Sequence, residues 1–206
     1  MGSVTMRMAG LQTGTAGLLL WLMTGLAPAH AETAKYNVDL EHSTVGFSVD
    51  HLVVSKTKGQ FMDYTGFIEM DPEAKTVKTI EAAVKTISIT TNHQKRDAHL
   101  KSPDFFDVEK FPTMTYKLKS YRKNGEGYEA VGDLTLKGVT KEVTLVGNLN
   151  GVTQDPWGNT RAGFTAEGKI NRKEYGINWS KALDNGGLVV GDDVFIKLDI
   201  ECIKAK

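Results

Sequence analysis

One stretch in the middle of the chain concentrates the polar side chains that could do chemistry, and it holds Lys95, Arg96, Asp97, His99 and Lys101. In one interpretation, Arg96 and His99 lie at the mouth of a cavity and hold a ligand's head group, a phosphate or a quinone oxygen, through charge-assisted hydrogen bonds. In the other, Arg96 and Asp97 pair or cap locally, while the phenylalanines that follow plug one end of the fold. We favour the structural interpretation.

The histidines are candidate metal ligands. After the first 31 residues the chain has His42, His51, His93 and His99. His93 and His99 are six residues apart and would lie on different faces of a helix, and no histidine or cysteine pair has the spacing of metal ligands. The sequence therefore predicts no metal site. His51 shares the parity of the apolar residues in its strand, which predicts that it closes a polar network at the strand's end or meets a ligand's head group.

Enzyme signatures are absent from the sequence, which has no nucleophile elbow, no glycine-rich phosphate loop and no zincin helix. Cys202, the only cysteine, has the inward parity of a strand, which predicts a buried, inert thiol. Trp157 and Trp179 form no stacking series, which disfavours nucleic acid as a partner. We therefore predict no catalytic residue and no cofactor. An enzyme that acts on a small amphiphile, with His51 or His99 as acid or base, remains an alternative.

The N-terminus has the organisation of a secretory signal. A short polar start with one positive charge precedes an apolar run over residues 16–27, and Ala29-His30-Ala31 has the small-x-small form that signal peptidase cleaves. The run is shorter than the roughly 20 residues that a spanning helix needs. We therefore expect residues 1–31 to be removed and residues 32–206 to form one domain, outside the cytoplasmic membrane and without a membrane span.

The rest of the chain has the pattern of short strands. Apolar residues recur at every second position, their alternates are mostly Thr, Lys, Glu and Asp, and turns rich in Gly, Asn, Asp and Pro separate the runs. Eight or so antiparallel strands, each with one solvent-exposed face, predict an all-β barrel or sandwich. The stretch from Thr91 to Lys101 breaks this period, and a capping residue at its start with Pro103 beyond its end predicts one short helix there.

The predicted inner face carries small residues among larger ones, which bears on whether the interior is filled. Eight strands close around a space that either packs shut or holds one small ligand. Glycines in strands also mark bulges and barrel corners, so on the residues alone a cavity and a filled core are equally open. The small inward residues are Gly66, Ala82, Ala130, Gly132, Ala166 and Gly168.

A series of motifs runs along the chain in a fixed order: Asp39-Leu40-Glu41-His42-Ser43, Gly59-Gln60-Phe61, Ser88-Ile89-Thr90-Thr91, Arg96 to Asp107, Gly132 to Lys141, Asp155-Pro156-Trp157-Gly158 and Gly168 to Arg172. In this order and spacing the sequence resembles the YceI-like family of polyisoprenoid-binding proteins. The resemblance implies a single eight-stranded antiparallel lipocalin-like barrel, secreted into the periplasm, with a long isoprenoid or similar lipid in its interior. It is also compatible with a homodimer.

We therefore predict a periplasmic protein that binds, carries or stores a long-chain isoprenoid lipid of polyprenyl phosphate or quinone type, with at most transient membrane contact. A stress-related interaction protein with a filled barrel is a second alternative. The candidates for head-group contact are His51, Arg96 and His99. Strand parity nominates as tunnel lining Phe47, Val49, Tyr64, Ile68, Met70, Val84, Tyr116, Leu118, Leu134, Leu136, Phe164, Ile170, Ile196 and Leu198.

Overall fold

The structure is a computed structural model that describes residues 1–2, 32–52, 54–181 and 188–206. Residues 3–31 of the predicted signal lie outside the described residues. The chain divides into two units, Met1–His30 and Ala31–Lys206, and all the strands lie in the second. No helix in the described ranges is long and apolar enough to cross a membrane.

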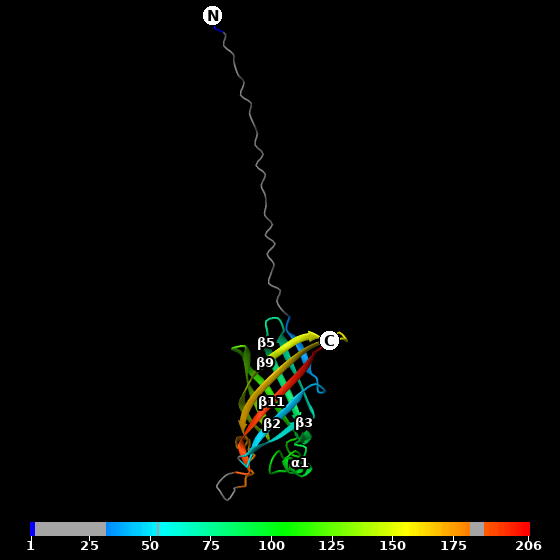
Figure 1. Ribbon diagram of the computed structural model, residues 1–206, viewed down its shortest axis with the longest axis vertical. Helices are drawn as coiled ribbons and strands as arrows, with labels where there is room; N and C mark the ends of the chain where they lie inside the picture. The colour runs from blue at the N-terminus through cyan, green and yellow to red at the C-terminus, as the bar shows by residue number, and fades with distance from the viewer. Residues whose placement is uncertain (3–31, 53, 182–187) are drawn as a thin grey trace. The chain divides into compact units, whose positions relative to one another are not determined.

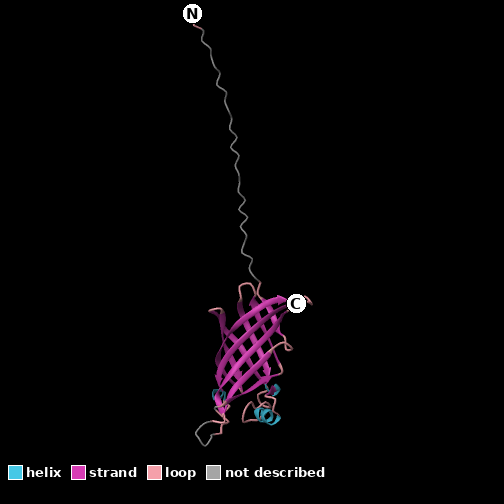
Figure 2. Cartoon of the chain, in the orientation of Figure 1, coloured by secondary structure: helices cyan, strands magenta, loops and turns pink. Residues whose placement is uncertain are grey.

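Eight antiparallel strands form a closed ring, because the first strand pairs with both the fourth and the last (Figures 1 and 2). This arrangement confirms the predicted eight-stranded barrel with one short helix. In order around the ring, the strands are β1 (Ala34–Val38), β4 (Tyr64–Asp71), β5 (Thr76–Lys85), β7 (Thr113–Asn124), β8 (Gly127–Leu136), β9 (Val139–Gln154), β10 (Thr160–Asn171) and β11 (Val190–Lys204).

Strand β11 is long enough to pair with two strands on the same edge. Its C-terminal part pairs with β1, with Cys202 opposite Val38, and its N-terminal part pairs with β2 (Thr44–His51), with Val194 opposite Val49. β3 (Ser55–Phe61) and β6 (Ile89–Thr90) continue the sheet beyond β2. These three strands extend the wall at the end of the barrel that carries helix α1 (Figure 1).

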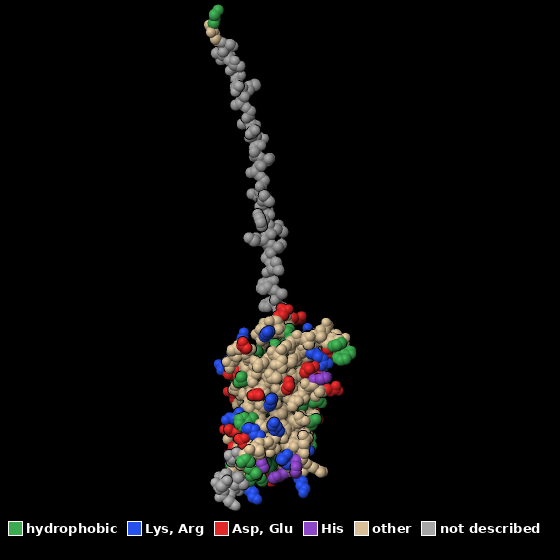
Figure 3. Space-filling model, viewed as in Figure 1, with side chains coloured by type: hydrophobic (Ala, Val, Ile, Leu, Met, Phe, Trp, Pro, Cys, Tyr) green, Lys and Arg blue, Asp and Glu red, His purple; other side chains and the backbone are tan. Residues whose placement is uncertain are grey.

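Strand β10 shows why the sequence folds this way. Ala162, Phe164 and Ala166 are buried, whereas the alternating Glu167 and Lys169 are exposed, which is the two-residue period of a strand with one dry face. The outer surface accordingly mixes acidic and basic side chains (Figure 3).

The turn between β8 and β9 fixes the register of that hairpin. Lys137 and Gly138 both have positive φ, 51° and 77°, as a two-residue type I′ turn requires. A Cβ on Gly138 would lie 2.8 Å from the ring of Phe111, so the position also favours glycine for space.

Helix α1 spans Gln94–Lys101, later than the predicted start at Thr91. His93 is the N-cap, and its Nδ1 accepts a hydrogen bond from the amide of Arg96. The Thr91 hydroxyl instead donates to Asp97. The predicted N-cap was therefore Thr91 instead of His93, because threonine is a common N-cap residue and histidine is not. Two 3₁₀ helices, η1 (Thr86–Ser88) and η2 (Arg172–Tyr175), complete the described elements.

The end of the barrel opposite α1 is tightly packed. Tyr36, Met70, Ala162 and Cys202 are each at most 1% exposed and belong to one apolar cluster. We call these four residues the packed layer. At the other end, separate clusters join the barrel wall to the helix segment and to η2.

Candidate functional site

A cavity of about 260 Å³ lies inside the barrel. Every strand of the ring contributes to its wall, together with β2 and β3, and the lining is almost wholly apolar. An engineered apolar cavity of about 150 Å³ stays dry and binds benzene-sized molecules, so this larger space is suited to hydrocarbon rather than to water. The cavity contradicts the alternative of a filled barrel.

Most of the residues nominated by strand parity lie on this wall. Met70 and Leu118 do not. Contact of any of them with a ligand stays a prediction. The nominated residues that line the cavity are Phe47, Val49, Tyr64, Ile68, Val84, Tyr116, Leu134, Leu136, Phe164, Ile170, Ile196 and Leu198.

Met70 and Leu118 point into the barrel, as strand parity predicted, but they lie further along the barrel axis than the cavity extends. Met70 belongs to the packed layer, and Leu118 packs against the same cluster. The cavity therefore does not reach the end of the barrel opposite α1, which is its closed end. Parity identifies the face of a strand and carries no information on depth along the barrel.

The small inward residues make room in two different ways. Ala82, Ala130 and Ala166 line the cavity, as expected. The space at two glycines is used by neighbours instead: a Cβ on Gly132 would lie 2.5 Å from the ring of Tyr116, and one on Gly168 would lie 2.7 Å from Leu145. These two glycines let large side chains lie against the wall, so they add no space for a ligand.

The segment from α1 to the following loop covers one end of the cavity. Leu100, Phe105 and Phe106 line it, and the ring of Phe106 meets that of Phe61 edge to face at 5.6 Å. Phe105 also lies 5.4 Å from Trp179, which joins this cover to the chain after η2. The cavity thus ends on aromatic side chains at the α1 end.

Arg96, a head-group candidate, has a local structural role. Its Nε donates to the Thr91 hydroxyl at 2.7 Å and its Nη2 to the Thr91 carbonyl at 3.1 Å, while Asp97 accepts from the Thr91 amide at 2.8 Å. Burial alone would raise the pKa of Asp97, but hydrogen bonds from Thr91 and Thr90 outweigh it and hold that pKa low. These contacts support the structural interpretation of this stretch.

The other two head-group candidates also lie off the cavity wall. The His99 ring is 2.9 Å from Asp104 and packs edge-on against Phe105 and Trp179. His51 ends β2 opposite Ser55. None of the four histidines in the described part of the chain lines the cavity. Contact of His51, Arg96 or His99 with a head group outside the cavity stays a prediction.

Several lining residues were not nominated from the sequence, and Arg172 is the one with a charged, buried side chain. It borders the cavity and is only 3% exposed. It stands two residues after Ile170, so the same alternation that nominated Ile170 could have found it. Its side chain ties the end of β10 to the start of β11 through Nε, which donates to the Gly191 carbonyl at 2.8 Å, and through an ion pair with Asp192 at 3.2 Å.

The cavity tyrosines keep their protons. Burial raises the pKa of Tyr116 to about 12, and it also raises that of Tyr128. Each hydroxyl donates to a backbone carbonyl, Tyr116 to Ala130 at 3.2 Å and Tyr128 to Thr165 at 3.1 Å. Both hydroxyl groups therefore donate their hydrogen bonds within the barrel wall.

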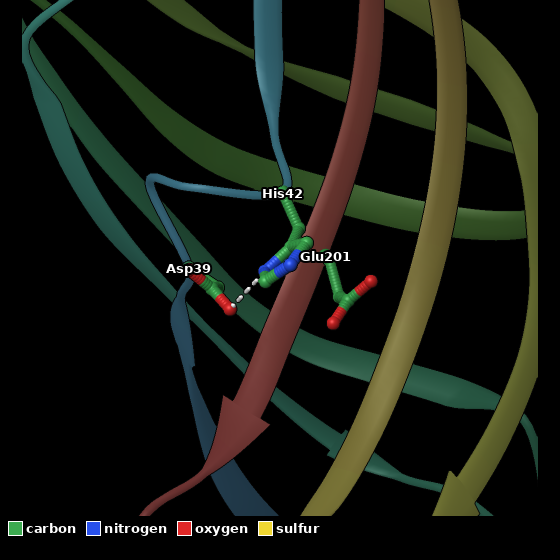
Figure 4. A group of neighbouring side chains, drawn as sticks. All are labelled: Asp39, His42 and Glu201. Carbon is green, nitrogen blue, oxygen red and sulfur yellow. Dashed lines mark hydrogen bonds and ion pairs between the residues drawn. The ribbon is translucent and has the colours of Figure 1, made fainter. Parts of the chain in front are cut away.

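One group of possible metal ligands lies outside the cavity. Asp39, His42 and Glu201 come together from the β1–β2 turn and β11 (Figure 4), which histidine spacing alone could not reveal. His42 Nδ1 lies 2.8 Å from Asp39, and Arg161 Nη1 contacts both Asp39 at 2.7 Å and Glu201 at 2.5 Å. Because Arg161 already pairs with both carboxylates, a metal ion would have to compete with it for them.

The same Arg161 gives the fold a predicted acid sensitivity through Asp155. Burial alone would raise the pKa of Asp155, but hydrogen bonds from Arg161 and from the side chain and amide of Asn159 outweigh it and hold that pKa far below its usual value. A lowered folded pKa stabilises above the unfolded pKa, about 3.9, and this stabilisation is lost as pH falls. Asp155→Asn should therefore lower the melting temperature at pH 7, and the gap from wild type should narrow below about pH 4.

The control for this titration is Asp193→Asn, which removes an exposed partner of Lys169. It should leave the melting temperature nearly unchanged at either pH. A gap between wild type and Asp155→Asn that stays constant from pH 7 to pH 2 would contradict the role of the carboxylate charge.

Comparison with known proteins adds the family. The model of the YceI-like domain matches residues 36–202. The chain is 42% identical to Protein YceI of Escherichia coli over 149 residues, which are 71% of this chain and 78% of that one. It is 39% identical to a UPF0312 protein of Serratia proteamaculans over 194 residues, 93% and 95% of the two chains.

Solved structures agree with the fold. The Campylobacter jejuni YceI protein has a TM-score of 0.67 at 32% identity and covers 76% of this chain and 90% of its own. A polyisoprenoid binding domain from Saccharophagus degradans has a TM-score of 0.59 at 13% identity over 84% of this chain and 100% of its own, a likeness of fold alone. With its closed barrel, its apolar cavity and a domain match over nearly the whole described barrel, this chain belongs to the YceI-like family.

Proposed function

We propose that the protein binds a long-chain isoprenoid lipid, of polyprenyl phosphate or quinone type, in the barrel cavity, and that it carries or stores this lipid in the periplasm. The observation that carries the proposal is the apolar cavity of about 260 Å³. The Saccharophagus degradans domain of the same fold, named for polyisoprenoid binding, supports the choice of ligand. The predicted signal over residues 1–31 supports the compartment.

The energetics of this proposal need only hydrocarbon burial. Each buried methylene contributes about 0.8 kcal/mol, so a tail that fills the cavity binds without a charged anchor. A carrier of this kind performs no bond-making step. The protein's task is to keep the tail out of water and to release it at an acceptor.

The test uses the full chain made in its own host. Native mass spectrometry of protein from a periplasmic extract should show a chain that begins at Glu32 and carries a lipid, which extraction then identifies. Protein that leaves the host with no lipid, and that takes up none when offered geranylgeraniol, would overturn the proposal.

A matched pair of variants ties the binding to the cavity. Ala166 lines the cavity, and the next residue, Glu167, is exposed on the outer face of the same strand. Ala166→Phe should lower lipid affinity about tenfold or more because its ring occupies the space of the tail, whereas Glu167→Phe should leave it unchanged. Equal effects of the two substitutions would place the lipid elsewhere.

A further inference from the structure

We propose that this cavity selects its ligands by the hydrocarbon tail and does not discriminate the head group, which stays outside the wall at the α1 end. The inference rests on the proposed function and adds a specificity rule to it. The buried polar groups that border the cavity already have hydrogen-bond partners within the protein.

The tyrosine hydroxyls have no proton left to offer a ligand. Tyr64 donates to the Ser43 carbonyl at 2.6 Å, Tyr116 to the Ala130 carbonyl on the adjacent strand, and Tyr128 to the Thr165 carbonyl on β10. A hydroxyl has one hydrogen to donate. To bind a quinone or phosphate oxygen, each tyrosine would have to break this hydrogen bond, and such a bond contributes about 0.5–1.5 kcal/mol to stability.

Arg172 is the one cationic side chain that borders the cavity among the described residues, and its donors are also in use. A guanidinium has five N–H groups. Those of Arg172 donate to the carbonyls of Ile177 at 2.8 Å, Trp179 at 2.7 Å and Gly191 at 2.8 Å, to that of Val190 at 3.5 Å, and to Asp192 at 3.2 Å. Asp192 pairs with both Arg172 and Lys173. Every N–H of Arg172 therefore already has an acceptor, so the side chain offers an incoming phosphate no free donor.

The remaining polar residues of the lining face away from the interior. Thr65 and Thr115 are exposed, and the Glu81 carboxylate, 42% exposed, pairs with Lys117 at 3.2 Å. No buried side-chain nitrogen or oxygen among the described residues lacks a hydrogen-bond partner. The part of the lining that the structure describes therefore presents no free polar group that could bind a head group.

The two ends of the cavity set the ligand's direction. The packed layer closes the end opposite α1, whereas only side chains such as Leu100, Phe105 and Phe106 cover the α1 end. A ligand therefore enters between these side chains, tail first, and its polar end remains beside them. Burying a phosphate in this interior would cost its hydration without any compensating hydrogen bond. A head group outside keeps its water, and its chemistry has little effect on affinity.

The experiment compares ligands that share one tail. Geranylgeraniol, geranylgeranyl phosphate and the benzoquinone with the same tail are titrated, below their aggregation concentrations, against one fluorescent fatty-chain reporter bound to the full mature chain. Their dissociation constants should agree within about threefold. Geraniol, which has the alcohol head but a shorter tail, should bind at least about tenfold more weakly than geranylgeraniol.

The possible results distinguish a failure of tail selection from a failure of lipid binding itself. If one head group binds more than about tenfold tighter than the other two, head-group discrimination exists and the inference is overturned while the lipid-binding function stands. If none of the three displaces the reporter, the proposed function itself fails. In Ala166→Phe, affinity for all three ligands should fall by the same factor; a loss confined to one of them would also overturn the inference.

Discussion

Replacing Arg172 by methionine should lower the free energy of unfolding by about 3–5 kcal/mol. The methionine fills similar volume but donates nothing, so the buried carbonyl of Ile177 and the partly buried carbonyls of Trp179 and Gly191 lose this donor. An unpaired buried acceptor costs about 1–3 kcal/mol. Asp192 contributes less to the loss. Equilibrium urea denaturation, followed by circular dichroism, measures the change.

The neighbouring residue supplies the control. Lys173 binds the same Asp192 at 2.8 Å, but its side chain is 41% exposed. Lys173→Met should change the free energy of unfolding by no more than about 1 kcal/mol. Arg172→Lys keeps the charge but cannot reach the same set of carbonyls, so it should recover only part of the loss. A wild-type-like Arg172→Met would show that water replaces the guanidinium at little cost.

The substitution Met70→Ala should also destabilise the protein strongly, lowering the free energy of unfolding by about 2–5 kcal/mol. Met70 is 1% exposed within the packed layer, and removing its side chain leaves a hole next to the closed end of the cavity. Urea denaturation again gives the size of the loss. If the hole joins the cavity, the variant should also bind longer isoprenoid tails relatively better than wild type does.

The matched control removes the same atoms from the surface. Met62 is 56% exposed, and Met62→Ala should change the free energy of unfolding by no more than about 0.5 kcal/mol. Similar losses for the two methionines would mean that the packed layer is not a tightly packed part of the core.

The barrel could be predicted from the sequence because its signal is local. Alternation in β10, with Phe164 inside and Glu167 outside, reports which face of a strand is buried, and most of the nominated lining follows from it. What alternation lacks is position along the barrel axis. For that reason Met70 was assigned to the cavity, although it lies in the packed layer.

The rest of the site depends on contacts between distant segments. Arg172 has the right parity, but an arginine is expected outside unless its partners are known. Those partners come from the segment after η2 and from β11. Gly132 likewise owes its role to Tyr116 on the adjacent strand. Neither relation is visible until the strands are paired.

The packed layer has a consequence for the protein's redox chemistry. Cys202 is fully buried, and burial raises the pKa of its thiol to about 12. At neutral pH the reactive thiolate is then a fraction on the order of 10⁻⁵. In the oxidising compartment that the signal segment predicts, this chain should resist mixed disulfides with its neighbours, and any dimer it forms would have to be held by non-covalent contacts.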